Sequence, residues 1–343
     1  MSRYRAETIT QEGETVYVLR DGHTGASARV WPGFGNNCLS AALPAPGGRL
    51  VDLLLAPGDL DALRAQPSWW GIPLLFPWPG RIPRGEYVFQ GQRYQLPTLD
   101  MNGNAGHGFA KTRPWKVERF EAWESAAFLR CSLSSADHAE TLEGYPFPYY
   151  LAATYRLDND GLHLIAEVMN VGPGPLPFGF GAHPYFRIPF GPEGSPAGCL
   201  ITVPAARRWD LARVAAPGTG ERLRWEDVTV PVTAETDLRT PRPLAGRHFD
   251  GGYTELDLGT GRLECRVIDP QTGLEGVMQA SRHFSTVVVY TPPGRPGVCF
   301  EPWTCPPNVF NLAASGVEPS GLIVLQPGQR WEGSMRLFVR SAR

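Results

Sequence analysis

The chain has 343 residues and a formal net charge of −2. This near balance of charge gives no electrostatic reason to expect a nucleic-acid partner. The 39 glycines and 34 prolines are spread along the whole chain, which favours the many tight turns of an all-β protein over one disordered segment.

The N-terminal part of the chain predicts strands and one short helix. Residues 14–20 and 86–96 have the pattern of strands, and the second is interrupted near Gly91. Residues 59–66 predict the helix. Because strands and helices do not alternate regularly, the sequence argues against a Rossmann fold or a TIM barrel.

The middle and C-terminal parts continue the β pattern. Residues 149–157 and 162–169 predict a hairpin, because Asp158-Asn159-Asp160-Gly161 between them is a turn signal. Residues 204–246 are richer in charge, proline and threonine and predict a long excursion. Residues 331–339 place apolar side chains at alternate positions, as in a strand with one buried face. We predict one domain over residues 1–343, an antiparallel β-sandwich of many strands.

Several functions and locations are disfavoured by missing features. No nucleotide-binding GxxxxGK[ST] loop, HExxH motif or GxSxG motif is present. No two histidines lie at a close metal-ligand spacing, and no two cysteines form a CxxC pair. Residues 1–20 lack the apolar core of a signal peptide, and no apolar run approaches the roughly 18 residues that span a bilayer. We therefore expect a reduced, cytoplasmic protein with no cofactor, no metal and no membrane partner.

Four segments place polar residues among glycines, prolines and aromatic residues. Three prolines in the first exclude an ordinary central strand, and Pro184 in the third favours an extended backbone before it. The fourth predicts an apolar strand whose residues alternate between two faces. The segments are residues 71–82 with Arg81, residues 102–109 with His107, residues 178–186 with His183, and residues 298–304 with Glu301.

Together these segments resemble the aldose 1-epimerase (galactose mutarotase) family. Its G-x-P-x-L-F-P…R-I, N-x-x-H-G, G-x-H-P-Y-F and late E-P-x-T motifs occur here in the family's order. The resemblance extends from about residue 30 to residue 339. It implies a large β-sandwich with an open sugar-binding cleft. The implied activity is that of an isomerase that interconverts the α and β anomers of an aldohexose.

The resemblance also implies the catalytic residues. Glu301 would be the general base, His183 the general acid, and His107 a second histidine near the ring oxygen. Ring opening needs a base at the C1 hydroxyl and an acid at the ring oxygen, with pKa values near the working pH. A histidine already titrates there, whereas a glutamate needs an apolar setting, which Phe300 and Trp303 can supply.

Sugar-binding residues are implied less uniquely. Arg81 and an aspartate would contact sugar hydroxyls. Asp250 is our choice of aspartate. The family usually has a second aspartate at the position of Gly251, so this match is weaker and Asp257 is an alternative. Trp78 and Trp303 are candidates for stacking on a sugar face.

Each of these residues could instead have a structural role. A histidine among aromatic rings is commonly a structural hydrogen-bonding residue, and Glu301 could instead form a buried ion pair with an arginine. Trp78 and Trp303 could simply belong to the core.

Other functions also remain open. A hexose-6-phosphate 1-epimerase would need a basic cluster, for which Arg84, Arg93, Lys111 and Arg113 are candidates. A sugar-binding protein without catalysis is disfavoured by the intact Glu301, His107 and His183. A glycoside hydrolase or lyase would normally need a second carboxylate, which the motifs do not show. We expect a small-molecule sugar as the ligand and a monomer or homodimer.

Overall fold

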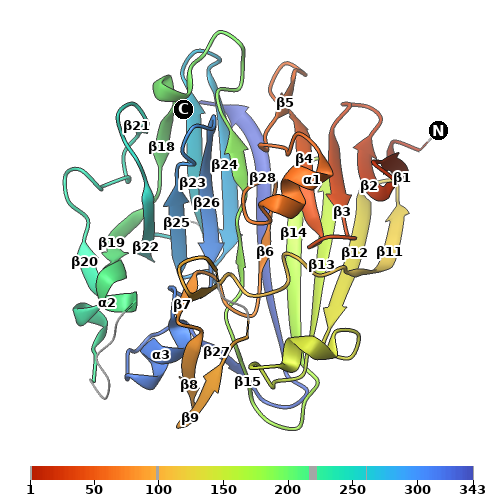
Figure 1. Ribbon diagram of the computed structural model, residues 1–343. Coiled ribbons are helices and arrows are strands. Elements are labelled where there is room, and N and C mark those ends of the chain that lie inside the picture. Colours follow the sequence, from red (N-terminus) through yellow and green to blue (C-terminus); the bar gives the residue numbers. More distant parts are fainter. Residues whose placement is uncertain (1, 98–99, 216–221, 260, 343) are drawn as a thin grey trace.

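A computed structural model of the protein describes residues 2–97, 100–215, 222–259 and 261–342. Most strands belong to three antiparallel sheets (Figure 1). The five-stranded sheet has the order β1 (Tyr4–Gln11), β2 (Glu14–Asp21), β3 (Ser27–Trp31), β4 (Asn37–Pro44) and β5 (Leu50–Asp52). The nine-stranded sheet has the order β11 (Lys116–Ala122), β12 (Ala127–Ser134), β13 (Tyr149–Asp158), β14 (Gly161–Asn170), β28 (Arg330–Ser341), β24 (Leu274–Ser281), β23 (Arg262–Asp269), β18 (Leu200–Thr202) and β21 (Arg242–Pro243).

The third sheet carries most of the candidate site. It has the order β20 (Thr229–Pro231), β19 (Ala205–Trp209), β22 (Asp250–Leu256), β25 (Thr286–Tyr290), β26 (Gly297–Trp303), β16 (Gly181–Ala182) and β6 (Leu74–Leu75), and β17 (Tyr185–Arg187) also pairs with β26. Three small ribbons join β7 (Arg81–Pro83) to β10 (Asn104–Gly106), β8 (Glu86–Phe89) to β9 (Gln92–Gln95), and β15 (Leu176–Phe178) to β27 (Ile323–Leu325). The short helices are α1 (Leu60–Ala65), α2 (Leu211–Ala215) and α3 (Val309–Ala314), with 3₁₀ turns at η1 (Ala139–Leu142), η2 (Pro196–Gly198) and η3 (Trp225–Asp227).

One apolar core joins the sheets. Leu43 of β4, Leu164 of β14, Met278 of β24 and Phe300 of β26 all belong to the same buried cluster. The sheets therefore pack face to face, and the predicted antiparallel β-sandwich is confirmed. Within the described ranges, no helix is both long enough and apolar enough to cross a membrane.

Local sequence signals are confirmed where they specify turns and caps. Asp158 pairs with Gly161 across the β13–β14 hairpin, and Gly161 has a φ of 119°. A Cβ there would collide with a backbone carbonyl of β28, so the turn requires glycine. The predicted short helix is α1, whose N-cap Asp59 accepts a hydrogen bond from the Ala62 amide at 2.6 Å.

The predicted excursion of residues 204–246 supplies edge strands to two sheets. β19 and β20 lie at one edge of the eight-stranded sheet, and β21 ends the nine-stranded sheet. Residues 216–221 of this segment lie outside the described residues.

The predicted apolar strand around Glu301 is β26, and its side chains alternate between two faces. All seven of its residues are buried. β26 lies inside its sheet, between β25 on one side and β16 and β17 on the other. Phe300 packs into the main core, whereas Glu301 and Trp303 face a cavity whose walls shield them from solvent.

Candidate active site

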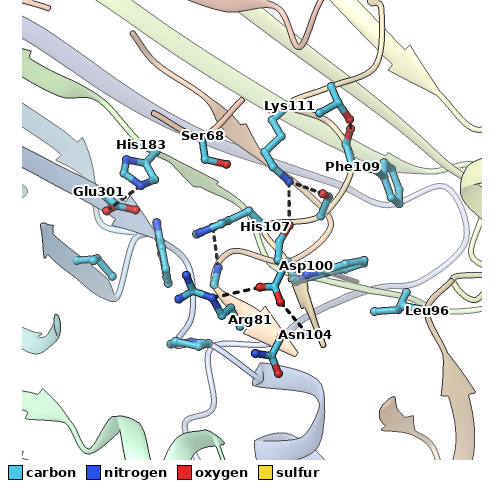
Figure 2. Close-up of a pocket in the computed structure, with 18 of the residues that line it drawn as sticks. Ser68, Arg81, Leu96, Asp100, Asn104, His107, Phe109, Lys111, His183 and Glu301 are labelled. Atoms are coloured by element: carbon cyan, nitrogen blue, oxygen red, sulfur yellow. Dashed lines mark hydrogen bonds and ion pairs between the residues drawn. The ribbon is translucent and has the colours of Figure 1, made fainter. Parts of the chain in front are cut away.

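A cavity of about 670 Å³ opens on the face of the eight-stranded sheet that lies away from the core. Its walls come from this sheet and from the loops around β7 and β10 (Figure 2). The structure brings together all seven sequence-predicted site residues in these walls: Trp78, Arg81, His107, His183, Asp250, Glu301 and Trp303. Asp257 is exposed, follows the far end of β22 and does not line the cavity.

Strand register places His183 against Glu301. In the antiparallel pairing with β26, Gly181 is opposite Trp303 and Tyr185 is opposite Cys299. His183 lies midway along the chain between Gly181 and Tyr185, and Glu301 lies midway between Trp303 and Cys299. The two residues therefore stand opposite each other. The Nε2 atom of His183 is 3.2 Å from Oε1 of Glu301. A dashed line marks this contact in Figure 2.

The pKa values of Glu301 and His183 are shifted in opposite directions. Burial raises the pKa of Glu301 well above its usual range, and the negative charge of Asp250 raises it further, while the neighbouring indole of Trp303 and the positive charge of Arg81 oppose the rise. Burial lowers the pKa of His183 to about 3. Burial therefore favours an uncharged pair, a protonated Glu301 carboxyl group beside a neutral His183 imidazole.

Each member of the pair has one atom free for a ligand. Oε2 of Glu301 and Nδ1 of His183 have no hydrogen-bond partner among the described residues. A buried polar atom without a partner is costly unless water or a ligand satisfies it. The ring of His183 also stacks on Tyr185, with ring centroids 4.7 Å apart, which fixes the orientation of the imidazole.

His107 approaches the pair from a strained loop. Its backbone has a φ of 58°, in the left-handed region that non-glycine residues rarely adopt. Two hydrogen bonds with Gly80 hold it: the His107 amide donates to the Gly80 carbonyl at 2.7 Å, and the Gly80 amide donates to Nδ1 of His107 at 3.1 Å. The ring lies 5.9 Å from that of His183.

The hydrogen bond at Nδ1 decides which nitrogen of His107 can donate. Burial lowers the pKa of His107 well below its usual value, and the positive charges of Lys111 and Arg81 and the proximity of His183 add to the shift. The ring is therefore neutral, and because Nδ1 accepts a hydrogen bond its proton resides on Nε2. His107 can donate that proton in a hydrogen bond to a ligand.

Arg81 and Asp250 contribute opposite charges to the cavity. Both side chains are exposed to solvent. Arg81 lies 3.5 Å from Asp100 through its Nε atom, which leaves the rest of its guanidinium group able to bind hydroxyls.

The two predicted tryptophans are mostly core residues. Trp78 and Trp303 are 5% and 3% exposed, and the Trp78 indole donates to the Ala105 carbonyl at 3.2 Å. Trp69 also lines the cavity and is more exposed, with the guanidinium group of Arg295 4.5 Å from its ring centroid. Trp69 is thus a better candidate for contact with a sugar face, and nothing in its sequence context marked it.

The basic cluster expected of a sugar-phosphate enzyme does not assemble. Lys111 and Arg113 line the cavity, but Arg84 and Arg93 do not. Arg113 is paired with Glu140 at 3.1 Å, and Lys111 donates to two backbone carbonyls.

A set of metal-capable atoms occurs at the His183–Glu301 pair. One donor atom each from His183, Cys299 and Glu301 lies within 4.8 Å of the others. Histidine, cysteine and glutamate are the ligand types that zinc accepts. Sequence spacing did not reveal this group, because strand pairing rather than chain proximity brings it together. A metal bound here would occupy both members of the acid–base pair.

Comparison with known proteins identifies the family. The chain belongs to the aldose 1-epimerase family, whose profile matches residues 17–337. It is 28% identical over 261 residues to the uncharacterized protein YihR of Escherichia coli strain K12, covering 75% of each chain.

Solved structures share the fold at lower identity. One is a galactose mutarotase-like protein from Clostridium acetobutylicum, with a TM-score of 0.84, 21% identity and 99% of each chain covered. Another is galactose 1-epimerase from Lactobacillus acidophilus, with a TM-score of 0.73, 16% identity, and 99% of this chain and 100% of that one covered.

Proposed function

We propose that the protein is an aldose 1-epimerase that interconverts the α and β anomers of an aldohexose by acid–base ring opening and closure. The observation that carries this proposal is the 3.2 Å contact between His183 and Glu301 in the cavity, with opposite shifts of their pKa values. Such a pair can hold one proton and pass it in either direction, which is what anomerisation requires. Membership in the family supports the same reaction class.

Ring opening would begin with a shift of the shared proton. Transfer from Glu301 to His183 creates a carboxylate and an imidazolium in place of two neutral groups. Glu301 then takes the proton of the C1 hydroxyl, and His183 protonates the ring oxygen as the C–O bond breaks. The products are the open-chain aldehyde, a neutral His183 and a protonated Glu301.

Ring closure would use the same groups in the opposite roles. After the aldehyde rotates about the C1–C2 bond, His183 removes the proton of the C5 hydroxyl and Glu301 returns a proton to the C1 oxygen. The proton arrangement beside the aldehyde, a protonated Glu301 and a neutral His183, is the one that burial of the two side chains favours. His107, which can donate from Nε2, would stabilise negative charge that develops on a sugar oxygen.

Polarimetry on freshly dissolved α-glucose, α-galactose and glucose 6-phosphate tests the proposal. We expect the protein to accelerate mutarotation of an unphosphorylated aldose, and Glu301→Gln to abolish most of that acceleration. The matched control is Glu264→Gln, the same substitution at a residue paired with Arg340 in the nine-stranded sheet, which should keep full activity. A rate enhancement confined to glucose 6-phosphate would instead identify a sugar-phosphate epimerase.

Two further assays distinguish an epimerase from a glycoside hydrolase and from a sugar-binding protein. The cavity contains Asp250 as well as Glu301, so a second carboxylate is available to a hydrolase, contrary to what the motifs indicated. Release of nitrophenol from nitrophenyl glycosides would reveal such an activity. Calorimetric binding of a sugar without any anomerisation would identify a sugar-binding protein and contradict the proposal.

A further inference from the structure

Lys111 holds the loop that carries His107. Its ammonium group donates to the carbonyl oxygens of Gly106 and Gly108, each at 2.8 Å, and these are the two residues that flank His107 (Figure 2). In the described part of the chain, no carboxylate forms an ion pair with Lys111, and its pKa is lowered to about 8 by burial. Its positive charge therefore faces the histidine loop without a neutralising partner.

The composition of the chain makes this lysine unusual. Of the 32 lysines and arginines, only two are lysines, Lys111 and Lys116. Lys116 is exposed in β11. An ammonium is a compact donor that can bond two converging carbonyls, whereas a guanidinium is a wide planar fork. The cavity thus contains a lysine in a chain that otherwise uses arginine almost throughout.

The loop needs such a restraint. His107 and Gly108 both have positive φ values, 58° and 62°. A non-glycine residue stays in this region only where its surroundings hold it there. The Gly80 hydrogen bonds fix His107 from one side, and Lys111 ties together the carbonyls on both sides of it.

We propose that Lys111 is a positioning residue for His107: its two hydrogen bonds close the loop that carries this histidine. Its positive charge also adds to the effect of burial, which is the larger cause of the low pKa of the imidazole. The role in anomerisation rests on the proposed function, whereas the effect on His107 does not. The charged and titratable groups that act on His107 are Lys111, His183 and Arg81. Of these three side chains, that of Lys111 donates hydrogen bonds to the carbonyls on both sides of His107.

Replacing Lys111 separates its two effects. Lys111→Met removes both the charge and the clamp, so the pKa of His107 should rise and kcat should fall roughly 10- to 100-fold, as for a displaced catalytic group. Lys111→Arg keeps the charge but not the geometry, so the pKa of His107 should stay low while kcat falls. Lys116→Met is the matched control and should behave as the wild-type protein.

The decisive readout is the titration of the His107 ring in the ligand-free proteins, followed by NMR and assigned by the signal lost in His107→Gln. A merely structural role would lower the folded fraction without moving this titration or the acid limb of the kcat/KM profile. The proposal is overturned if Lys111→Met leaves both the His107 titration and kcat at the values of Lys116→Met. It is also overturned if Lys111→Arg shifts the titration as far as Lys111→Met does. Because the titration needs no substrate, its result stands apart from any failure of the polarimetric test.

Discussion

Substituting Glu301 by glutamine should reduce activity and raise stability at once. The amide keeps the shape and the neutrality of the protonated carboxyl group, but it cannot take a proton from the sugar. We expect kcat to fall roughly 10²- to 10⁴-fold with KM little changed, the range for loss of a general acid–base group.

The stability effect follows from the raised pKa of Glu301. Between the ordinary pKa of glutamate and the raised folded value, the folded protein keeps a proton that the unfolded chain releases. In that window each unit of rising pH costs the wild-type protein about 1.4 kcal/mol of unfolding free energy. The contribution of Glu301 to the stability of the wild-type protein is fully present only below the ordinary pKa of glutamate. Glu301→Gln lacks this dependence, so its advantage should grow as the pH rises.

Urea unfolding of both proteins from about pH 5 to about pH 8 measures this difference. Glu264→Gln is the control with the opposite sign. The pKa of Glu264 is lowered despite its partial burial, and its hydrogen bond to Arg340 at 2.6 Å contributes to the lowering. That variant should lose stability by a similar amount across this whole pH range, because a lowered folded pKa contributes fully above the ordinary glutamate pKa and is lost only as the pH falls through the lowered folded value.

One result would refute the reasoning about Glu301. If Glu301 were the anionic half of a structural ion pair with a protonated His183, glutamine would leave a buried charge without its partner. The variant would then be destabilised at every pH at which the pair is charged, while its folded fraction kept normal kcat. A destabilised but fully active Glu301→Gln protein would end the catalytic assignment.

Two other substitutions test the cavity. Asp250→Asn should raise KM. Because it also removes a charge that raises the pKa of Glu301, any limb of the pH–rate profile due to Glu301 should move to lower pH. Asp257→Asn lies outside the cavity and should change neither KM nor the pH–rate profile. Gly108→Ala should lower the unfolding free energy by about 3 kcal/mol, since the residue has a positive φ and its Cβ would collide with a backbone carbonyl. Gly103→Ala has a similar φ but open space around it, so chemical denaturation should show a loss of only about 1 kcal/mol, and equal losses would contradict the collision.

The family resemblance located the candidate residues but did not predict their electrostatic state. An apolar neighbourhood for Glu301 was expected from Phe300 and Trp303. Burial of all seven residues of β26 strengthens the effect of this neighbourhood on the pKa of Glu301. The low pKa of His183 was not expected, because a histidine in an open cleft would titrate near neutrality. Its burial depends on the loops that form the cavity walls, which sequence patterns do not place.

The sequence by itself determined the features that depend on neighbours along the chain. The β13–β14 turn, the N-cap of α1 and the buried face of β28 arise from interactions within a few residues or from simple alternation, so their patterns are visible in the sequence. Tertiary structure alone decided which side chains meet. Strand register sets His183 opposite Glu301, and a loop fold brings the Lys111 ammonium to the carbonyls beside His107. These contacts, and the pKa shifts that burial causes, depend on the packing of segments far apart in sequence, which no local pattern records.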